Sequence, residues 1–600
     1  MQEAETVLNV IRERGRRALP LERLYRHLFN RQLFLMAYGR IYANAGSMTP
    51  GVTPETVDGM SLEKIDGIIG RLRSETYRWR PVRRVEIPKP NGRTRPLGVP
   101  TWSDKLVAEV VRLLLDAYYD AQFSDRSHGF RASRGCHTAL SEVAHKWTGT
   151  SWFIEGDLAD FFGSLDHEIM LSTLAERIHD GRFLQLVERM LKAGYLADWK
   201  LHPTHSGAPQ GGPVSPLLSN IYLDRFDQFV EKELIPEYTR GARRARHRPY
   251  ERLRGELQKA RRAHDVDRIR ELKREMRTMP GVDPDDPDYR RLRYVRYADD
   301  FLLGFSGPKR EAEEIKARIG EFLRDELRLE LSEQKTLITH ASSQAARFLG
   351  YEVRVQRADC KISGGRRATN GKIGLYVPRD VIRKRCAGYM RRGKPAELGL
   401  RIHDSDFSIV GNYGAELRGV IQYYLMAQNV GTLSRLQWVM ECSMLRTLAS
   451  KHSSTTTKMS RKYKRTITTS YGERRCFMVE VPRDGKPPLV AKFGETPLRR
   501  QRTVSAEDRI HRAHPGRTEL VKRLLAEECE ACGAGYGLQV HHVRKLADLN
   551  QPGRKEKSFW IELMATRRRK TLVVCVSCHN KIHGHGTGSS RNGSLESRVR

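Results

Sequence analysis

The chain has 600 residues and a formal net charge of +35, from 107 Lys and Arg against 72 Asp and Glu. This length predicts several domains, and a basic excess spread along the whole chain favours nucleic acid as the partner. No apolar run approaches the roughly 20 residues that cross a bilayer, and the first residues do not resemble a secretory leader. We therefore expect a cytoplasmic protein that associates with nucleic acid and with no membrane.

The first 380 residues alternate short apolar strands with longer amphipathic helices, which is typical of an α/β or α+β fold. Residues 1–17 predict an amphipathic helix, and Asp104 is placed to cap another. The apolar face of that second helix carries Val107, Val110, Val111, Leu114 and Tyr118. Residues 241–290 interrupt the pattern because they are dense in both signs of charge. We expect a solvated helical insertion there, with a basic side that can touch RNA.

Two loop segments predict close approach to a phosphate-bearing ligand. Residues 85–101 predict two strands joined by a turn that points Lys89 and Arg95 outward, where they can clamp a triphosphate. By itself this pattern is also an ordinary basic hairpin. Residues 207–223 begin with a Gly- and Pro-rich loop, which allows a nucleotide to approach the backbone. The helix that follows is expected to bury Leu217, Leu218, Ile221 and Tyr222.

Three carboxylates predict a site for divalent metal. An apolar strand in residues 151–167 runs into Asp157. Residues 292–305 place Asp299 and Asp300 between two apolar runs, which predicts a hairpin with both carboxylates at its tip. Adjacent carboxylates repel each other unless a cation is bound, although acidic hairpin turns are also common. Together the three fit a site for two Mg²⁺ ions, one activating a primer 3′-hydroxyl and one holding a triphosphate.

Four of the nine cysteines form two Cys-x-x-Cys pairs near the C-terminus. These are Cys529, Cys532, Cys575 and Cys578, a complete set for tetrahedral Zn²⁺ in a reducing compartment. Four thiolates would stabilise a unit with little core of its own, so we expect this zinc to be structural.

The motifs, in this order, resemble the reverse transcriptase family, and the match is close to the proteins encoded by group II introns. It covers nearly the whole chain and depends on IPKPNGRTRPLGVPT, SHGFRASRGCHTAL, DLADFFGSLDH, PQGGPVSPLLSNIYL, YADD, LELSEQKTLIT and ARFLGYEV. The resemblance implies an RNA-directed DNA polymerase with right-hand fingers and palm. Residues 412–428 and 447–465 resemble the thumb-like maturase domain, which binds intron RNA and helps it to fold for splicing.

By position, the resemblance implies roles in metal binding and nucleotide selection. Asp157, Asp299 and Asp300 match the metal-binding carboxylates. Phe162 matches the aromatic gate that excludes a ribose 2′-hydroxyl and so selects deoxynucleotides, with Phe161 as the alternative.

Four further positions match residues that bind the incoming nucleotide or the template. Gln210 matches the glutamine of the nucleotide pocket, and Lys89 and Arg95 match the triphosphate clamp. Lys335 lies where the family binds template–primer, and a solvated lysine is the ordinary alternative.

Residues 538–546 and 578–585 resemble the HNH (ββα-metal) endonuclease family. The resemblance implies that His542 is a general base that activates water near neutral pH. It also implies a second metal site, for Mg²⁺ or Mn²⁺, held by His541, His579 and His583. The alternative is a zinc-stabilised knuckle that binds DNA and does not cleave it. The additional histidines disfavour this alternative.

One part of the HNH pattern departs from the family. Many members carry an Asn that orients the base, just before the second knuckle strand. Here Lys570 lies near that position, and Asn550 and Asn580 are unranked substitutes. This difference bears on which residue orients the general base more than on whether the domain cleaves DNA.

We predict a multidomain α/β (α+β) protein. Its expected parts are fingers and palm at 1–380, a helical thumb/maturase domain at 381–480, a basic DNA-binding segment at 481–520, an HNH endonuclease at 521–586 and a disordered tail at 587–600. The protein is expected to bind its group II intron RNA to assist splicing, to nick target DNA, and to copy the intron RNA from that primer with deoxynucleoside triphosphates. Oligomeric state is left open.

Two alternatives belong to other functional classes. One is a splicing-only RNA-binding maturase, which the intact Asp157 and YADD sequence disfavour. The other is a reverse transcriptase of a retron or diversity-generating type, which the maturase-like and HNH segments disfavour.

Overall fold

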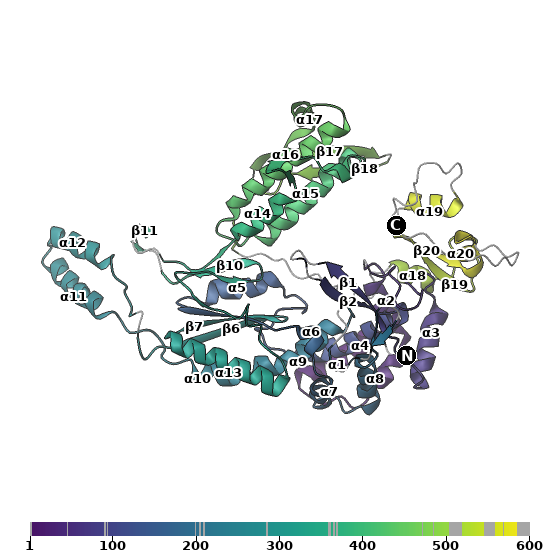
Figure 1. Ribbon diagram of the computed structural model, residues 1–600, viewed down its shortest axis with the longest axis horizontal. Helices are drawn as coiled ribbons and strands as arrows, with labels where there is room; N and C mark the ends of the chain where they lie inside the picture. Colours follow the sequence, from purple (N-terminus) through teal and green to yellow (C-terminus); the bar gives the residue numbers. More distant parts are fainter. Residues whose placement is uncertain are drawn as a thin grey trace.

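The computed structural model describes residues 3–44, 46–88, 92, 94–197, 200–202, 204, 206–207, 211–283, 286–357, 362–363, 366–367, 370–470, 472–483, 485–502, 519–544, 558–567 and 569–584. Its fold is a mixture of helices and sheets (Figure 1). None of the helices in these residues is both long and apolar enough to span a bilayer.

The middle of the molecule is a four-stranded antiparallel sheet, called here the central sheet. In spatial order its strands are β6 (Arg291–Tyr297), β7 (Asp300–Ser306), β3 (Trp152–Asp157) and β8 (Ile338–His340). Helices cover both faces of this sheet. On one face lie α9 (Ser215–Phe229) and α13 (Lys309–Leu327), and on the other lies α5 (Cys136–Lys146). Successive residues of a strand contribute to separate hydrophobic cores on the two faces of the sheet. On β3, Ile154 packs in one core and Phe153 packs in the other. Burial on both faces explains why these strands are almost continuously apolar.

The sharp turn between β6 and β7 confirms the predicted hairpin. Tyr297 pairs with Asp300, and Ala298 adopts a φ of 56°. Gly129 lies directly against the turn, because a Cβ atom there would be 2.4 Å from the Ala298 nitrogen. Only glycine allows this approach.

A buried ion pair holds the base of this hairpin. Arg296 on β6 and Asp227 on α9 are 1% and 0% exposed, and the Arg296 Nε donates to Asp227 Oδ1 at 2.7 Å. Arg296 also donates to the Ala298 carbonyl at 2.9 Å and to the Ser127 hydroxyl at 2.9 Å. The Tyr294 hydroxyl donates to the same Asp227 oxygen. The pair therefore connects α9 to the turn that carries the acidic residues.

Asp224, one helical turn before Asp227, provides a test by pH. Burial and the Asp227 charge raise the pKa of Asp224 to about 7. The folded protein then keeps a proton that the unfolded chain releases near pH 4, so stability falls as pH rises from about 4 to 7. We expect Asp224→Asn to remove this loss and to raise the free energy of unfolding above pH 7 by about 2–4 kcal/mol. Urea unfolding of wild type and variant at pH 5 and pH 8 measures the gain in free energy of unfolding. A gain of the same size at both pH values would contradict the prediction.

The N-terminal region is mainly helical. Its elements are α1 (Ala4–Arg16), η1 (Tyr25–Phe29), α2 (Arg31–Ile41), α3 (Leu62–Arg73), α4 (Trp102–Tyr119), α6 (Phe161–Ser164), α7 (His167–Ala175) and α8 (Gly181–Leu191). The predicted apolar face of α4 is buried. The predicted cap is wrong: Thr101 is the N-cap and accepts from the Asp104 amide. Asp104 is buried in the first turn, where it accepts the Tyr77 hydroxyl at 2.6 Å.

A second sheet, called here the hairpin sheet, lies beside this region. Its strands, in spatial order, are β2 (Thr94–Val99), β1 (Val82–Pro88), β4 (Tyr195–Ala197) and β5 (Lys200–His202). Strands β1 and β2 pair antiparallel from Arg83 with Val99 to Pro88 with Thr94. This pairing confirms the predicted basic hairpin.

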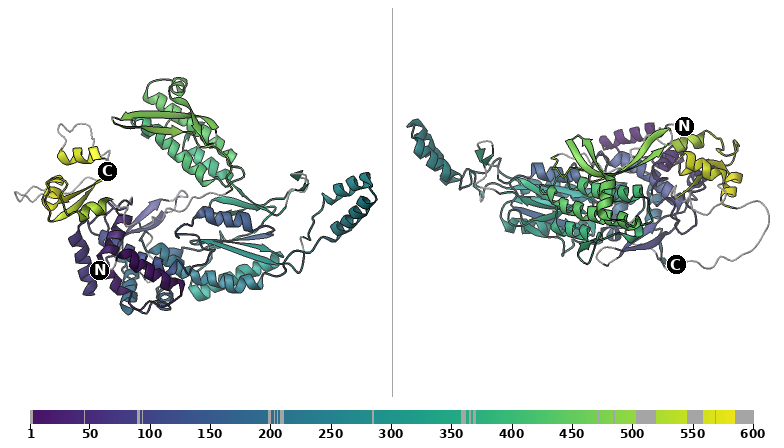
Figure 2. Two further views of the ribbon diagram at one scale, coloured as in Figure 1. Left: turned by 180° about the vertical axis from the view of Figure 1, so that it is seen from behind. Right: turned by 90° about the horizontal axis from the view of Figure 1, so that it is seen from above.

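The charged insertion forms a helical hairpin that projects from the molecule (Figures 1 and 2). Helices α11 (Arg248–Arg262) and α12 (Val266–Met276) follow η2 (Val230–Leu234) and α10 (Ile235–Glu237). They share a small core of their own, made of Leu253, Leu257, Ala260, Leu272 and Met276. The helical prediction for this segment is confirmed.

A helical unit lies above the central sheet in Figure 1. Along the chain, the strands that connect the two are β9 (Ala346–Phe348), β10 (Tyr351–Val355), β11 (Ile362–Ser363), β12 (Arg366–Arg367) and β13 (Ile373–Tyr376). The unit contains α14 (Arg379–Ala387), β14 (Met390–Arg391), β15 (Lys394–Pro395), η3 (Gly399–Arg401), α15 (Asp406–Tyr423), η4 (Val430–Leu433), α16 (Ser434–Lys451) and α17 (Thr456–Tyr463).

The end of the helical unit differs from expectation. A helical domain is predicted to residue 480 and a basic DNA-binding segment from 481. The structure instead has an antiparallel sheet across this boundary, formed by β16 (Lys464–Thr469), β17 (Gly472–Arg483) and β18 (Lys486–Phe493). The sheet packs on α15 so closely that a Cβ atom on Gly414 would overlap the Lys492 carbonyl. Residues 503–518 of the predicted basic segment and the predicted tail lie outside the described residues.

The last unit, residues 519–584 and called here the C-terminal unit, packs beside α2 and α3 in both figures. It contains α18 (Glu519–Leu525), β19 (Leu538–His542), α19 (Phe559–Arg567), β20 (Thr571–Cys575) and α20 (Val576–Ile582). Its buried apolar residues, including Val540, are continuous with the core of the N-terminal region.

Candidate functional site

Three carboxylates meet at one end of the central sheet. Asp157 ends β3 and Asp300 begins β7, and the two are directly paired across the strands. Asp299 precedes Asp300 in the turn. Burial, Asp299 and Asp157 together raise the pKa of Asp300 to about 7, and burial also raises the pKa of Asp299. A divalent cation would relieve this repulsion, and the all-oxygen donor set fits Mg²⁺.

Two cationic residues named from the sequence lie at this cluster. Lys335 Nζ is 2.7 Å from Asp157 Oδ2. Arg95, on β2 of the hairpin sheet, is close enough for its charge to lower the pKa of Asp299. Arg95 on the hairpin sheet is therefore within electrostatic reach of the carboxylates on the central sheet. Lys89 and Gln210 lie outside the described residues.

A pocket of about 300 Å³ lies between the hairpin sheet and the start of α9. Its lining includes Arg84, Gly98, Phe162, Gly207 and Val214. Phe162 is thus at the pocket, whereas Phe161 is 3% exposed and packs in the core against Tyr222. Gly207 has a φ of +93°, and a Cβ atom there would be 2.8 Å from the Phe162 carbonyl oxygen. The close approach that this glycine allows is to the chain's own backbone.

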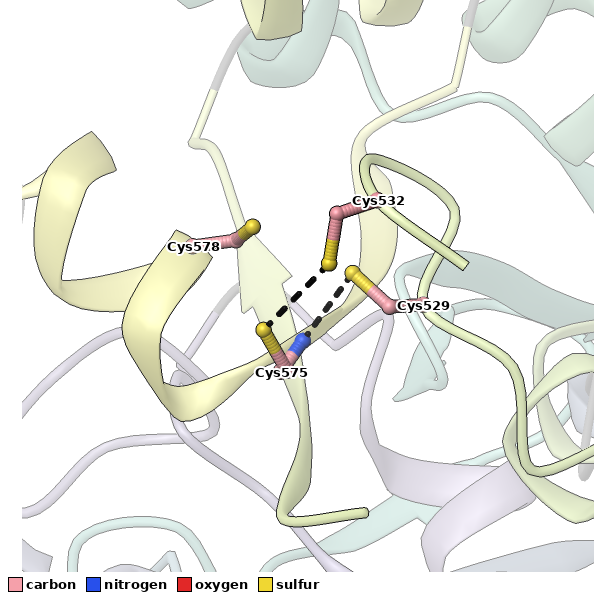
Figure 3. Close-up of side chains that lie close together, drawn as sticks. All are labelled: Cys529, Cys532, Cys575 and Cys578. Atoms are coloured by element: carbon pink, nitrogen blue, oxygen red, sulfur yellow. Dashed lines mark hydrogen bonds between the residues drawn. The ribbon is translucent and has the colours of Figure 1, made fainter. Parts of the chain in front are cut away.

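The four cysteines of the two Cys-x-x-Cys pairs converge (Figure 3). Cys529 and Cys532 follow α18, while Cys575 ends β20 and Cys578 lies on α20. Their sulfur atoms lie within 4.8 Å of one another, and Cys532 and Cys575 are 3.7 Å apart. Zn–S bonds of about 2.3 Å in a tetrahedron separate sulfur atoms by about 3.8 Å. The cluster is therefore compatible with zinc.

A second group of possible metal ligands lies in the same unit. It consists of Asp58, His541, His579 and His583, whose ligand atoms all lie within 4.8 Å of one another. His541 comes from β19, and the other two histidines lie on and just after α20. The structure thus brings together the three histidines named from the sequence. Imidazole nitrogens and one carboxylate oxygen form a donor set that several divalent ions accept.

His542 is directed away from this group. Its Nε2 lies 3.4 Å from the Tyr38 hydroxyl, and the side chain is buried. Burial lowers its pKa to about 4. Adjacent residues of a strand point to opposite sides, so His542 faces α2 when His541 faces the other histidines. Its role as general base stays a prediction.

The structure describes two of the three candidates for an orienting residue. Lys570 and Asn580 are exposed, and Asn550 lies outside the described residues. Sequence reasoning missed Asp58, which is contributed by the N-terminal region. No flanking pattern marks this residue, since its partners are distant in the chain.

Three family models match separate parts of the chain. Reverse transcriptase (RNA-dependent DNA polymerase) matches residues 87–353, type II intron maturase matches 371–475, and AI2M/AI1M-like HNH endonuclease matches 529–579. The first range contains the carboxylate cluster, and the third contains all four cysteines.

Curated relatives match over most of the chain. Group II intron-encoded protein LtrA of Lactococcus lactis subsp. cremoris is 37% identical over 94% of this chain and 96% of its own. An uncharacterized 91 kDa protein in the cob intron of Schizosaccharomyces pombe is 33% identical over 93% of this chain and 69% of its own. Protein YkfC of Escherichia coli is 30% identical over 56% of this chain and 84% of its own.

The fold, the acidic hairpin and these matches define a reverse transcriptase that also carries a maturase domain and an HNH endonuclease domain. The chain belongs to the group II intron-encoded proteins. Reverse transcriptase and endonuclease activities follow from the two enzyme domains, and divalent metals are the cofactors that both families use.

Proposed function

We propose that the protein copies its own group II intron RNA into DNA at a target site that it has nicked. The observation that carries this proposal is the meeting of Asp157, Asp299 and Asp300 on the central sheet, within electrostatic reach of Arg95 on the hairpin sheet. The central sheet would be the palm, the hairpin sheet the fingers, and the helical unit the thumb of a right-hand polymerase.

Each predicted residue has a specific task in this polymerase. Two Mg²⁺ ions, when bound by the three carboxylates, would lower the pKa of the primer hydroxyl and neutralise the triphosphate. Arg95 and Lys89 would hold the triphosphate, and Gln210 would line the nucleotide site. Phe162 would exclude a ribose 2′-hydroxyl, and its position at the pocket supports it over the buried Phe161.

The RNA partner would be the intron that encodes the chain. The maturase family match and the net charge of +35 support binding of a long polyanion. We propose that the helical unit and the charged helical hairpin contact this RNA and stabilise its splicing-competent fold. A protein of this kind is expected in the cytoplasm, associated with nucleic acid.

The C-terminal unit would nick one strand of the target DNA. Zn²⁺ in the four-cysteine cluster would hold β20 and α20 against the loop after α18, without a part in the chemistry. Mg²⁺ or Mn²⁺ held by His541, His579 and His583 would polarise the scissile phosphate. We propose that His542 activates the water, which requires its ring to leave the contact with Tyr38.

The coupling of nicking to synthesis can be tested with the protein–intron complex and a DNA duplex that carries the joined flanking exons. Wild type is expected to give complementary DNA joined covalently to the cleaved strand. His579→Ala should give none, because the nick is missing, yet should still extend a supplied primer. Asp299→Ala/Asp300→Ala should nick and give no complementary DNA. Gel analysis of end-labelled target separates these products, and joined product from His579→Ala would refute nick-primed synthesis.

A further inference from the structure

A short segment of the N-terminal region, residues 57–60 between α2 and α3, lies along β19 of the C-terminal unit. The Gly59 amide donates to the Val540 carbonyl at 3.0 Å, and the Val540 amide donates to the Met60 carbonyl at 2.8 Å. Met60 and Val540 form an antiparallel bridge. The side chains of Val57, Met60 and Val540 are fully buried. This contact is therefore a packed interface with strand-like pairing.

The interface carries Asp58 into the group of histidines. Asp58 Oδ1 is 3.4 Å from His541 Nδ1 and 3.4 Å from His579 Nε2. The second oxygen, Oδ2, is 2.9 Å from His583 Nε2. The backbone amide of His542 donates to Oδ1 at 2.7 Å and fixes the carboxylate.

These separations match those between the ligands of one metal ion. Donor atoms at about 2.1 Å from an ion lie about 3.0 Å apart at neighbouring corners of an octahedron and about 3.4 Å apart in a tetrahedron. His541 gives independent support, since its side chain is only 5% exposed. Within the described part of the chain, neither of its ring nitrogens makes a hydrogen bond of good geometry, and the Asp58 oxygen that faces Nδ1 is 3.4 Å away. A buried imidazole that is paired so loosely is costly, and a bound ion would satisfy it.

We propose that Asp58 is a fourth protein ligand of the nuclease metal and that it closes this site against DNA. The inference rests on the proposed function, in which three histidines hold the catalytic ion. Mg²⁺ and Mn²⁺ take six ligands, so three histidines leave positions open for DNA. The Asp58 carboxylate takes one of these positions and places a negative charge beside the others, where an anionic phosphate oxygen would have to bind. DNA therefore enters only when residues 57–60 leave β19.

Binding of Mn²⁺ to the full chain tests the ligand directly. The measurement uses the Asp299→Ala/Asp300→Ala background, so that the polymerase carboxylates bind no ion, and Mn²⁺ is chosen because it avoids thiolates. Asp58→Asn keeps the size of the side chain and an oxygen for the His542 amide. Asp66→Asn is the matched control, because Asp66 lies exposed on α3 and pairs with Arg31.

We expect Asp58→Asn to raise the Mn²⁺ dissociation constant about tenfold or more, as loss of a ligand should, and Asp66→Asn to leave it unchanged. Electron paramagnetic resonance of free Mn²⁺ gives these constants. With saturating Mn²⁺, Asp58→Asn is also expected to nick the joined-exon duplex faster than the parent protein.

An unchanged dissociation constant in Asp58→Asn would overturn the ligand assignment. A weaker constant together with slower nicking would overturn the closure, because Asp58 would then belong to the working site. His579→Ala separates the inference from the function beneath it. If that variant binds Mn²⁺ as tightly as the parent, the histidines hold no ion and the proposed nuclease site itself fails.

Discussion

Replacement of Asp299 and Asp300 by alanine is expected to reduce DNA synthesis on an RNA template on the order of 10³-fold or more. Both carboxylates lie with Asp157 in one partly buried cluster. Without them, the cations that would activate the primer hydroxyl and neutralise the triphosphate lose most of their ligands. Primer extension with Mg²⁺ and deoxynucleotides measures the change.

The control for this experiment is Asp325→Ala, which removes an exposed carboxylate from α13. It should extend primers as wild type does, and all three proteins should bind RNA equally in a filter assay. Synthesis by the double variant at a rate near that of wild type would contradict the metal site. If wild type itself is folded, binds RNA and makes no product on several templates, the splicing-only alternative is favoured.

Loss of the buried Arg296–Asp227 ion pair is expected to cause the largest decrease in the free energy of unfolding. Arg296→Met leaves the Asp227 carboxylate buried without its cation, and such a loss costs about 3–5 kcal/mol. The variant also loses the hydrogen bond to the Ala298 carbonyl, which anchors the acidic turn. We therefore expect a lower free energy of unfolding and weaker primer extension. Urea unfolding followed by circular dichroism measures the first effect.

Arg291→Met is the matched control, because Arg291 lies on the same strand and its guanidinium reaches an exposed carbonyl. It should change the free energy of unfolding little. The double variant Arg296→Met/Asp227→Leu should recover part of the stability, since no unpaired charge is then buried. A loss from Arg296→Met no larger than that from Arg291→Met would show that the pair contributes little.

Several features of the candidate sites could be predicted because their signal is local. The turn that carries Asp299 and Asp300 follows from two charges between apolar runs, and strand pairing then sets its shape. The two-residue spacing within each Cys-x-x-Cys pair is visible in the sequence and is typical of zinc ligands. The fold then brings the two pairs together. The helix at 102–119 was also predictable from its apolar period, although its cap was not. Thr101 and Asp104 are both good capping residues, and burial against Tyr77 decides between them.

The strands at 464–493 were not predictable from a local pattern. Strand β17 carries charged residues at consecutive positions, such as Arg474 and Arg475, so the alternation of a half-buried strand is weak. The strand is stabilised by pairing on both sides and by packing on α15. These are tertiary contacts, which override weak local preference.

The sequence by itself determined the chemistry of this protein: its acidic hairpin, its cysteine pairs, its histidines and its family. Only the tertiary structure decided which distant residues meet. It joins Asp58 to the His542 amide across 484 positions of the chain, and it buries His542 against Tyr38. It also pairs Arg296 with Asp227 at the base of the turn that carries Asp299 and Asp300. Spacing along the chain reports local periods, whereas contacts of this kind arise when separate hydrophobic faces pack together and bring their polar neighbours with them.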